Sequence, residues 1–206
     1  MIKILSISGS PVKEASTDII LHRLSEAVID ALGPHETAEM SFVKLNDLKF
    51  IPCQACGEAP TPRFCFWDDL NEVYDLLVNE CDLLLFGSPV YFDSVSAQAK
   101  AFIDRCNCFR PADFENSDPA HDFIKLLKKK RPGAIILVGG ENGYYEGARR
   151  VIAGFFKWVE VVNEGLITYA SPDFRKKGSA ADDAELSARI GELGKHLASV
   201  LMKKTE

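Results

Sequence analysis

Residues 1–17 read MIKILSISGSPVKEAST, an apolar segment followed by a loop rich in serine and glycine. The segment from Ile2 to Ile7 has the length and composition of a buried β-strand. After the loop, apolar side chains recur at helical spacing from Ile20 to Ala31, and Gly33-Pro34 ends that pattern. A strand, a short loop and a helix in this order form the first part of a βαβ unit.

The same alternation of apolar strands and amphipathic helices continues along the chain. Further strand-like segments lie at residues 38–45, 82–86, 134–138 and 161–169, each followed by a loop and a helical pattern. Strands that are apolar throughout need helices on both faces of the sheet. We therefore expect a single domain over residues 1–206, an α/β three-layer sandwich with a five-stranded parallel sheet of order 2-1-3-4-5.

Composition and charge exclude several classes of protein. The chain has 206 residues, 47% of them hydrophobic, and a formal net charge of −6, which argues against a nucleic-acid partner because phosphate contacts need a basic face. No apolar run is long enough to span a membrane, and a core strand follows Met1 directly, where a secretory signal would show a different pattern. We expect a cytoplasmic protein whose six cysteines are not structural disulfides.

The loop between the first strand and the first helix is a candidate phosphate site. Backbone N–H groups at a helix start, together with the helix dipole, attract anions. Hydroxyl donors come from Ser8, Ser10, Ser16 and Thr17, and Lys13 adds a cation. Neither the G-x-G-x-x-G pattern nor Gly-Lys-Ser/Thr is present, so the loop favours a terminal monophosphate. The alternative is that these serines only form a turn and a helix cap.

Two further loops follow the third and fourth strands. They read GSPVYF at residues 87–92 and GGENGYY at residues 139–145. Ligands of open α/β sheets bind beyond the carboxyl ends of the strands, so both loops should face the phosphate loop. We expect a turn over residues 89–92 and contacts to a planar ring from Pro89, Val90, Tyr91, Phe92, Gly139, Gly140 and Asn142. Tyr144 and Tyr145 would help to shape the substrate pocket, although aromatic residues in such loops also serve packing.

Residues 8–17, 87–92 and 100–105 (KAFIDR) together resemble the NADPH-dependent FMN reductase and iron–sulfur flavoprotein group, in order and spacing up to about Trp158. The resemblance implies a flavodoxin-like fold and bound FMN. It implies phosphate contacts at Ser10, Ser16 and Thr17 and ring contacts at residues 89–92 and 139–142. It also implies a homodimer or homotetramer. One departure is Val12, where many relatives carry an arginine.

The cysteines depart from the family pattern as well. Iron–sulfur flavoproteins carry a compact run of four cysteines, of which this chain keeps Cys53, Cys56 and Cys65, with Ala59 at the third place. A cluster normally needs four thiolates, and a helix of about 14 residues would carry Cys106 and Cys108 roughly 20 Å from the site. We therefore expect no iron–sulfur cluster and no metal, but a degenerate loop near the flavin. A cluster, a zinc site using Asp68 and a redox-active Cys53–Cys56 pair stay open.

The resulting functional hypothesis is an FMN-dependent oxidoreductase that passes electrons from NAD(P)H to a quinone, a flavin or a similar small acceptor. No acid–base residue is assigned, because a flavin carries the redox chemistry itself and the protein positions it. The alternatives are an electron carrier served by a redox partner protein, and a flavin-binding sensor. The long connection at residues 109–131 would be a lid or an oligomer contact.

Overall fold

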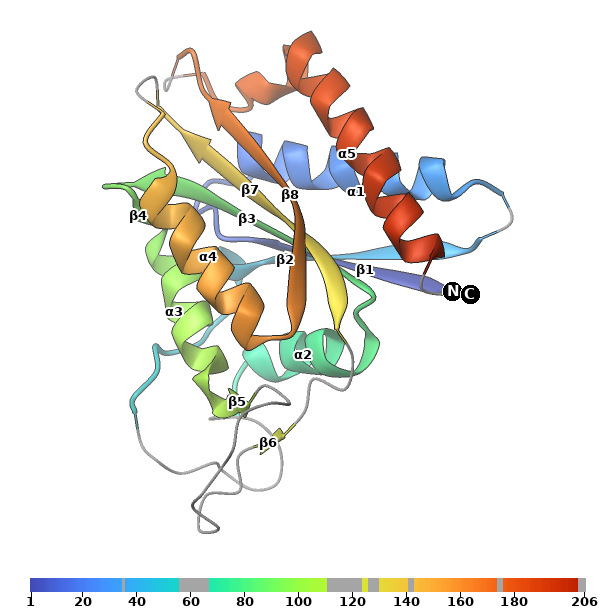
Figure 1. Cartoon of the computed structure of the whole chain (residues 1–206). Helices are drawn as coiled ribbons and strands as arrows, with labels where there is room; N and C mark the ends of the chain where they lie inside the picture. Colours follow the sequence, from blue (N-terminus) through green and yellow to red (C-terminus); the bar gives the residue numbers. More distant parts are fainter. Residues whose placement is uncertain are drawn as a thin grey trace.

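The structure, a computed structural model, describes residues 1–34, 36–55, 67–110, 124–125, 130–140, 143–173 and 176–203. Five parallel strands form its central sheet in the order β2-β1-β3-β7-β8 (Figure 1). Their bounds are Ile2–Ser8 (β1), Ala38–Lys44 (β2), Leu83–Tyr91 (β3), Arg131–Gly139 (β7) and Val161–Ala170 (β8). Counted along the chain, these strands have the order 2-1-3-4-5, so the predicted topology is confirmed.

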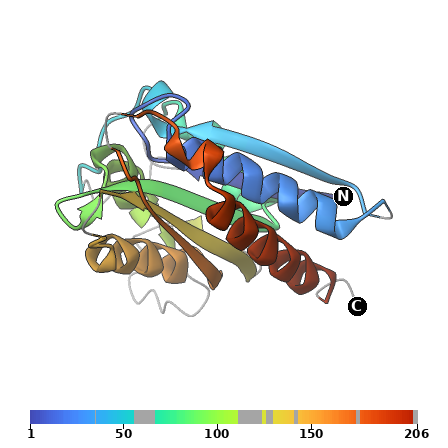
Figure 2. The ribbon, with the colours of Figure 1, turned by 90° about the horizontal axis from the view of Figure 1, so that it is seen from above.

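Helices cover both faces of this sheet, as the apolar strands predict. The helices are α1 (Ser16–Leu32), α2 (Leu70–Asp75), α3 (Ala97–Arg105), α4 (Glu146–Trp158) and α5 (Ala184–Met202). Figure 2 shows α1 and α5 side by side on one face, with α4 on the other. A Cβ atom on Gly194 would lie 2.6 Å from the Cβ of Ala27, so the glycine allows α1 and α5 to pack closely.

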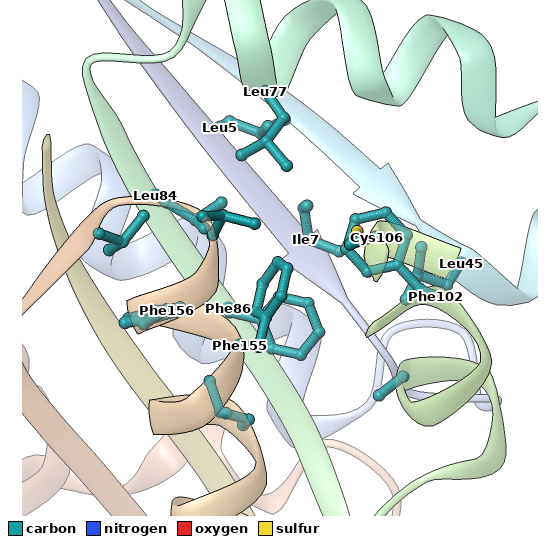
Figure 3. Close-up of a cluster of buried hydrophobic side chains, with 14 of the residues drawn as sticks. Leu5, Ile7, Leu45, Leu77, Leu84, Phe86, Phe102, Cys106, Phe155 and Phe156 are labelled. Atoms are coloured by element: carbon teal, nitrogen blue, oxygen red, sulfur yellow. The ribbon is translucent and has the colours of Figure 1, made fainter. Parts of the chain in front are cut away.

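Alternating side chains of the strands divide the core into two layers. Leu5 and Ile7 of β1 and Phe86 of β3 point to the side of α2, α3 and α4, where Figure 3 shows them packed with Phe102 and Phe155. The intervening residues of the same strands point to the side of α1 and α5. This period of two places two hydrophobic clusters on opposite faces of one sheet.

Strand β3 is longer than expected, and the predicted turn over residues 89–92 is wrong for its first three residues. Pairing with β7 continues to Pro89, which lies opposite Val138. Tyr91 then pairs antiparallel with Ser94 of β4 (Ser94–Val95), an additional short strand. Proline fits at position 89 because β1 pairs with β3 only as far as Gly87. The nitrogen of Pro89, which carries no hydrogen, therefore faces a side of β3 that has no partner strand at this point.

Smaller elements complete the described chain. Strands β5 (Phe109–Arg110) and β6 (Ile124–Lys125) form a separate pair, within the long connection. Turns of 3₁₀ helix lie at Leu45–Asp47, Cys106–Cys108 and Ser179–Asp182, and α2 continues into a π-helical turn at Leu76–Glu80. Among the described residues, no helix combines the length and the apolar composition needed to cross a bilayer.

Candidate functional site

A cleft of about 270 Å³ gathers most of the residues expected at the ligand site. It lies beyond the carboxyl ends of β3 and β7, which point to the same side of the molecule in Figure 1. Its lining consists of Ser10, Val12, Ala15, Ser16, Thr17, Pro89, Val90, Tyr91, Val138, Gly139, Gly140, Ser171, Lys176, Lys177 and Gly178. We call this the carboxyl-edge cleft.

Helix α1 opens onto this cleft without a side-chain cap. Its N-cap residue is Ala15, whose side chain cannot accept a hydrogen bond, so the first N–H groups of the helix keep their donor capacity. Thr17 lines the cleft and is only 1% exposed. Its methyl group faces Gly87, and its hydroxyl has no hydrogen-bond partner among the described residues. Both the uncapped start of α1 and the hydroxyl of Thr17 therefore offer hydrogen-bond donors to an anion in the cleft.

The serine hydroxyls of the loop have partners within the protein. Ser8 is fully buried and donates to the carboxylate of Asp18, and the hydroxyl of Ser10 bonds with the backbone of Val12. The hydroxyl of Ser16 accepts from the N–H of Ala180 at 3.3 Å. Ser10 and Ser16 line the cleft, whereas Ser8 lies beneath it. Because Ser16 only accepts in this contact, its O–H stays available as a donor. The available donors are therefore the helix N–H groups and the hydroxyls of Ser16 and Thr17.

A buried ion pair lies under the loop. Lys44 of β2 bonds both carboxylate oxygens of Asp18, at 2.9 and 2.7 Å, and donates to the carbonyl oxygen of Val12 at 3.0 Å. Both side chains are 7% exposed. Asp18 in the first turn of α1 would repel a bound anion, and Lys44 neutralises that charge. Lys13 lines a different cleft, along β2.

The side of the cleft where we expect the planar ring is formed by the ends of strands. Pro89, Val90 and Tyr91 line it from β3, and Gly139 and Gly140 line it from the end of β7. Phe92 is fully exposed at the tip of the β3–β4 hairpin, where its φ of 52° and the φ of 56° at Asp93 correspond to a type I′ turn. Asn142 lies outside the described residues.

Tyr144 and Tyr145 differ in environment. Tyr144 is 74% exposed. The ring of Tyr145 packs on Gly139, since a Cβ atom there would lie 2.8 Å from it, and burial raises the pKa of the Tyr145 phenol. The hydroxyl of Tyr145 is buried without a hydrogen-bond partner among the described residues. Because Gly139 has no side chain, the ring of Tyr145 lies close to its backbone, and a ligand in the cleft can approach the same backbone.

Sequence reasoning missed one wall of the cleft. Ser171, Lys176, Lys177 and Gly178 follow β8, and we call them the C-terminal wall. The fifth strand is parallel to the others, so its carboxyl end had to reach the same edge of the sheet. The pattern Lys-Lys-Gly at residues 176–178, a few residues beyond the end of that strand at Ala170, was the available indication.

The described start of the cysteine-bearing segment, which includes Cys53, lies elsewhere than expected. The buried Arg105, the last residue of α3, donates to the carbonyl oxygen of Ile51 and to the carboxylate of Asp68, both at 2.7 Å. Cys53 and Asn107 consequently line one cleft, of about 570 Å³, between α3 and α4. The predicted separation of Cys53 from the end of α3 is therefore wrong, because the chain after β2 extends back along α3 to Arg105.

The structure also describes the surroundings of Cys81. Cys81 is buried, which raises the pKa of its thiol to about 11 and keeps it protonated at neutral pH. Within the part of the chain that the structure describes, no group of three or more His, Cys, Asp or Glu side chains is arranged to hold a metal. Cys56 and Cys65 lie outside that part.

Three other clefts exceed the carboxyl-edge cleft in volume. One of about 530 Å³ follows the edge strand β2, one is the cleft between α3 and α4, and one of about 400 Å³ lies between α1 and α5. None of the three contains the uncapped start of α1 together with strand ends. We place the candidate ligand site in the smallest of these four clefts because it alone among them combines free donors with glycine backbone at the carboxyl edge.

Comparison with known proteins concerns the family and the fold of the chain. An iron–sulfur flavoprotein of Methanocaldococcus jannaschii is 31% identical over 155 residues, which are 75% of this chain and 71% of that protein. The solved structure of an NADH:FMN oxidoreductase is similar with a TM-score of 0.66 at 16% identity, over 97% of this chain and 90% of that chain. An archaeal flavodoxin is similar with a TM-score of 0.55 at 12% identity, over 98% and 99% of the two chains.

Both structures share the layered parallel sheet found here, and at these identities they establish the fold alone. The fold is therefore flavodoxin-like, as expected from the order of the strands. The family model described as NADPH-dependent FMN reductase matches residues 2–170, from the start of β1 to the end of β8. The chain belongs to the NADPH-dependent FMN reductase family.

Proposed function

We propose that the protein binds FMN in the carboxyl-edge cleft and passes electrons from NAD(P)H to a quinone, a flavin or a similar small acceptor. The observation that carries the proposal is the joining of two features in one cleft. The uncapped start of α1, with the unpartnered hydroxyl of Thr17, provides donors for a phosphate. The glycine-bearing end of β7 gives a planar ring access to the backbone.

Each side of the cleft has a separate task in this proposal. The N–H groups at the start of α1 and the hydroxyl of Thr17 bind the phosphate. Gly139 and Gly140 allow the ring to approach main-chain donors, and Tyr91 and Val90 shield it from water. Bound FMN would supply the hydride and electron chemistry, which is why no acid–base side chain is required.

The charge of the cleft supports an anionic cofactor. Its described lining contains Lys176 and Lys177 and no carboxylate. Flavodoxin-type carriers usually surround their ring with acidic residues, so this lining favours the oxidoreductase over the alternative of an electron carrier. The nicotinamide donor is supported by the description of the matching family and by the related NADH:FMN oxidoreductase.

We also propose that the protein is a homodimer or homotetramer in which the partner covers the ring. The aromatic side chains of Phe92, at the tip of the β3–β4 hairpin, and of Tyr144, in the loop after β7, are 104% and 74% exposed. The proposal is that a partner subunit covers both, since contiguous exposed apolar surface marks interfaces. Light scattering coupled to gel filtration will give the oligomeric state, and a monomer in both the apo and the FMN-loaded protein would contradict this part.

Anaerobic titration of the FMN-loaded protein with NADPH and with NADH tests the reaction. We expect at least one nucleotide to bleach the flavin absorbance, and a quinone or free FMN to restore it. The variants Thr17→Val and Thr17→Ser form a matched pair, since valine keeps the methyl group facing Gly87 but removes the hydroxyl. Thr17→Val should weaken FMN binding about tenfold or more, the effect of losing one hydrogen bond to a charged group.

Thr17→Ser should retain FMN affinity to within about threefold of the parent protein, because it keeps the hydroxyl. Titration by flavin fluorescence measures both affinities. Equal losses in the two variants would show that Thr17 acts through packing. A parent protein that binds no FMN, or that neither nucleotide reduces, would contradict the proposed function.

A further inference from the structure

The C-terminal wall is fixed to the start of α1. The guanidinium of Arg23, on α1, donates to the carbonyl oxygens of Ala181 at 2.8 Å and Ala180 at 3.3 Å. The N–H of Ala180 donates to the hydroxyl of Ser16. Gly178 has a φ of 70°, and a Cβ atom there would lie 3.0 Å from Ile19. These contacts hold Lys176 and Lys177 at a set position beside the phosphate-binding turn.

The β1–α1 loop itself brings no free cation into the cleft. Val12, which lies in the lining, is apolar. Lys13 lines the cleft along β2, and Lys44 is engaged with Asp18 underneath. A flavin phosphate carries about −1.5 to −2 charges at neutral pH, because its second pKa lies near 6. The cationic side chains of the described lining are those of Lys176 and Lys177.

Lys177 differs from Lys176 in the partner that it contacts. Its Nζ atom lies 3.3 Å from the carboxylate of Glu14, which belongs to the β1–α1 loop, so the ion pair crosses from the C-terminal wall to that loop. Lys176 is paired instead with Asp182, a residue of its own segment. The Lys177 and Glu14 side chains are 50% and 75% exposed, and an exposed pair of this kind is weak. A phosphate dianion can therefore displace one carboxylate.

We propose that Lys177 is the cation that binds the FMN phosphate. Glu14 holds its ammonium group over the β1–α1 loop until the phosphate takes the place of the carboxylate. This inference rests on the proposed binding of FMN in the carboxyl-edge cleft. It makes Lys177 a determinant of specificity, because riboflavin has the same ring without the phosphate and offers Lys177 nothing to bind.

Paired titrations with FMN and riboflavin test the assignment on the full chain. We expect Lys177→Gln to weaken FMN binding about tenfold and to leave riboflavin binding within about twofold of the parent value. Glu14→Gln should strengthen FMN binding several-fold, because the competing carboxylate is gone. Raising the salt concentration should weaken FMN binding more in the parent protein than in Lys177→Gln.

Lys195→Gln on the exposed surface of α5 is the matched control, with the same change of charge and unchanged affinities for both flavins. Equal weakening of FMN and riboflavin in Lys177→Gln, or no change for either, would overturn the assignment. A loss of FMN affinity in Lys176→Gln but not in Lys177→Gln would overturn it as well. A parent protein that binds neither flavin would refute the proposed function itself, and the assignment with it.

Discussion

Asp18 and Lys44 show how a single buried pair determines the shape of the phosphate-binding turn. Asp18 accepts from Ser8 on one side and from Lys44 on the other, and Lys44 also reaches the carbonyl oxygen of Val12. One network therefore connects β1, the β1–α1 loop, α1 and β2. Since both charges are buried, their pairing is needed to offset the cost of removing them from water.

Replacing Lys44 tests this network. We expect Lys44→Met to lower the free energy of unfolding by about 3 kcal/mol, because the carboxylate of Asp18 stays buried without its cation. Lys100→Met is the control: the pair of Lys100 with Asp104 is about half exposed on α3, and its loss should cost less than about 1 kcal/mol. Urea denaturation measures both values, and similar losses in the two variants would contradict the role assigned to Lys44.

At this scale the sequence indicated which residues belong to the site, but not what each side chain does there. Ser8 and Thr17 both carry hydroxyl groups in the predicted loop, yet only Thr17 lines the cleft. Ser8 is the last residue of β1, where the alternation of the strand points its side chain to Asp18. The role of Ser8 depends on the charge of Asp18, and the spacing of residues in the sequence does not show that these two side chains meet.

Among the elements, α1 and β3 approach each other closely beside the site. A Cβ atom on Gly87 would lie 2.8 Å from both Thr17 and Leu21, so β3 must carry a glycine at the position where α1 begins. Gly154 on α4 is the opposite case, an exposed helical position with nothing within 4 Å of a Cβ atom. Substitution by alanine should therefore lower the stability of the protein at position 87 and raise it at position 154.

We expect Gly87→Ala to destabilise the protein by about 1–3 kcal/mol, because the added methyl group overpacks the contact and moves the start of α1. The same variant should weaken FMN binding. Gly154→Ala should stabilise the protein by about 0.5–1 kcal/mol, because alanine has the higher helix propensity and meets no atoms there. Denaturant midpoints measure both changes in stability, provided that the dependence of the unfolding free energy on denaturant concentration is unchanged. A Gly87→Ala protein that is as stable as the parent and binds FMN with unchanged affinity would refute the close-contact argument.

The extent of β3 shows why the bounds of a strand were harder to predict than its existence. Gly87, Ser88 and Pro89 resemble a turn locally, but β7 is long enough to pair with them as far as Pro89. The hairpin to β4 then adds two more paired residues. Whether glycine and proline end a strand depends on which neighbour lies beside them, and that neighbour comes from a distant part of the sequence.

For the whole molecule, the carboxyl-edge cleft joins parts of the chain that are far apart in sequence. Its walls come from the β1–α1 loop, the ends of β3 and β7, and the C-terminal wall after β8. A ligand in this cleft contacts elements from both halves of the chain. It should therefore stabilise the complete fold and not a local segment, because it binds only where all of these elements are assembled.

Unfolding with and without ligand measures this coupling. At a free FMN concentration of about 100 times its Kd, we expect the free energy of unfolding to rise by about 2.7 kcal/mol. The rise should appear as a shift of one cooperative transition, followed by circular dichroism. Riboflavin at the same concentration should give a smaller shift, because it lacks the phosphate held at α1. Equal shifts for FMN and riboflavin would contradict phosphate anchoring.

Local pattern was sufficient for the architecture. The period of two in the strands, the helical spacing between them and the right-handed crossovers leave few arrangements. The resemblance to a family with a flavodoxin-like fold then favoured the strand order that the structure has. The same reasoning located the loops after the first, third and fourth strands at one edge, because the carboxyl ends of parallel strands share it. These properties depend on neighbouring residues, so they can be inferred without coordinates.

Long-range contacts settled the rest. Lys177 meets Glu14 across 163 positions of sequence, and Arg105 reaches back 54 residues to Ile51. No local pattern encodes either contact, because each depends on how two separate elements pack on the sheet. Folding thus determined which cation contacts the β1–α1 loop and where Cys53 lies, because the partners of a charged or buried polar group are set by three-dimensional proximity.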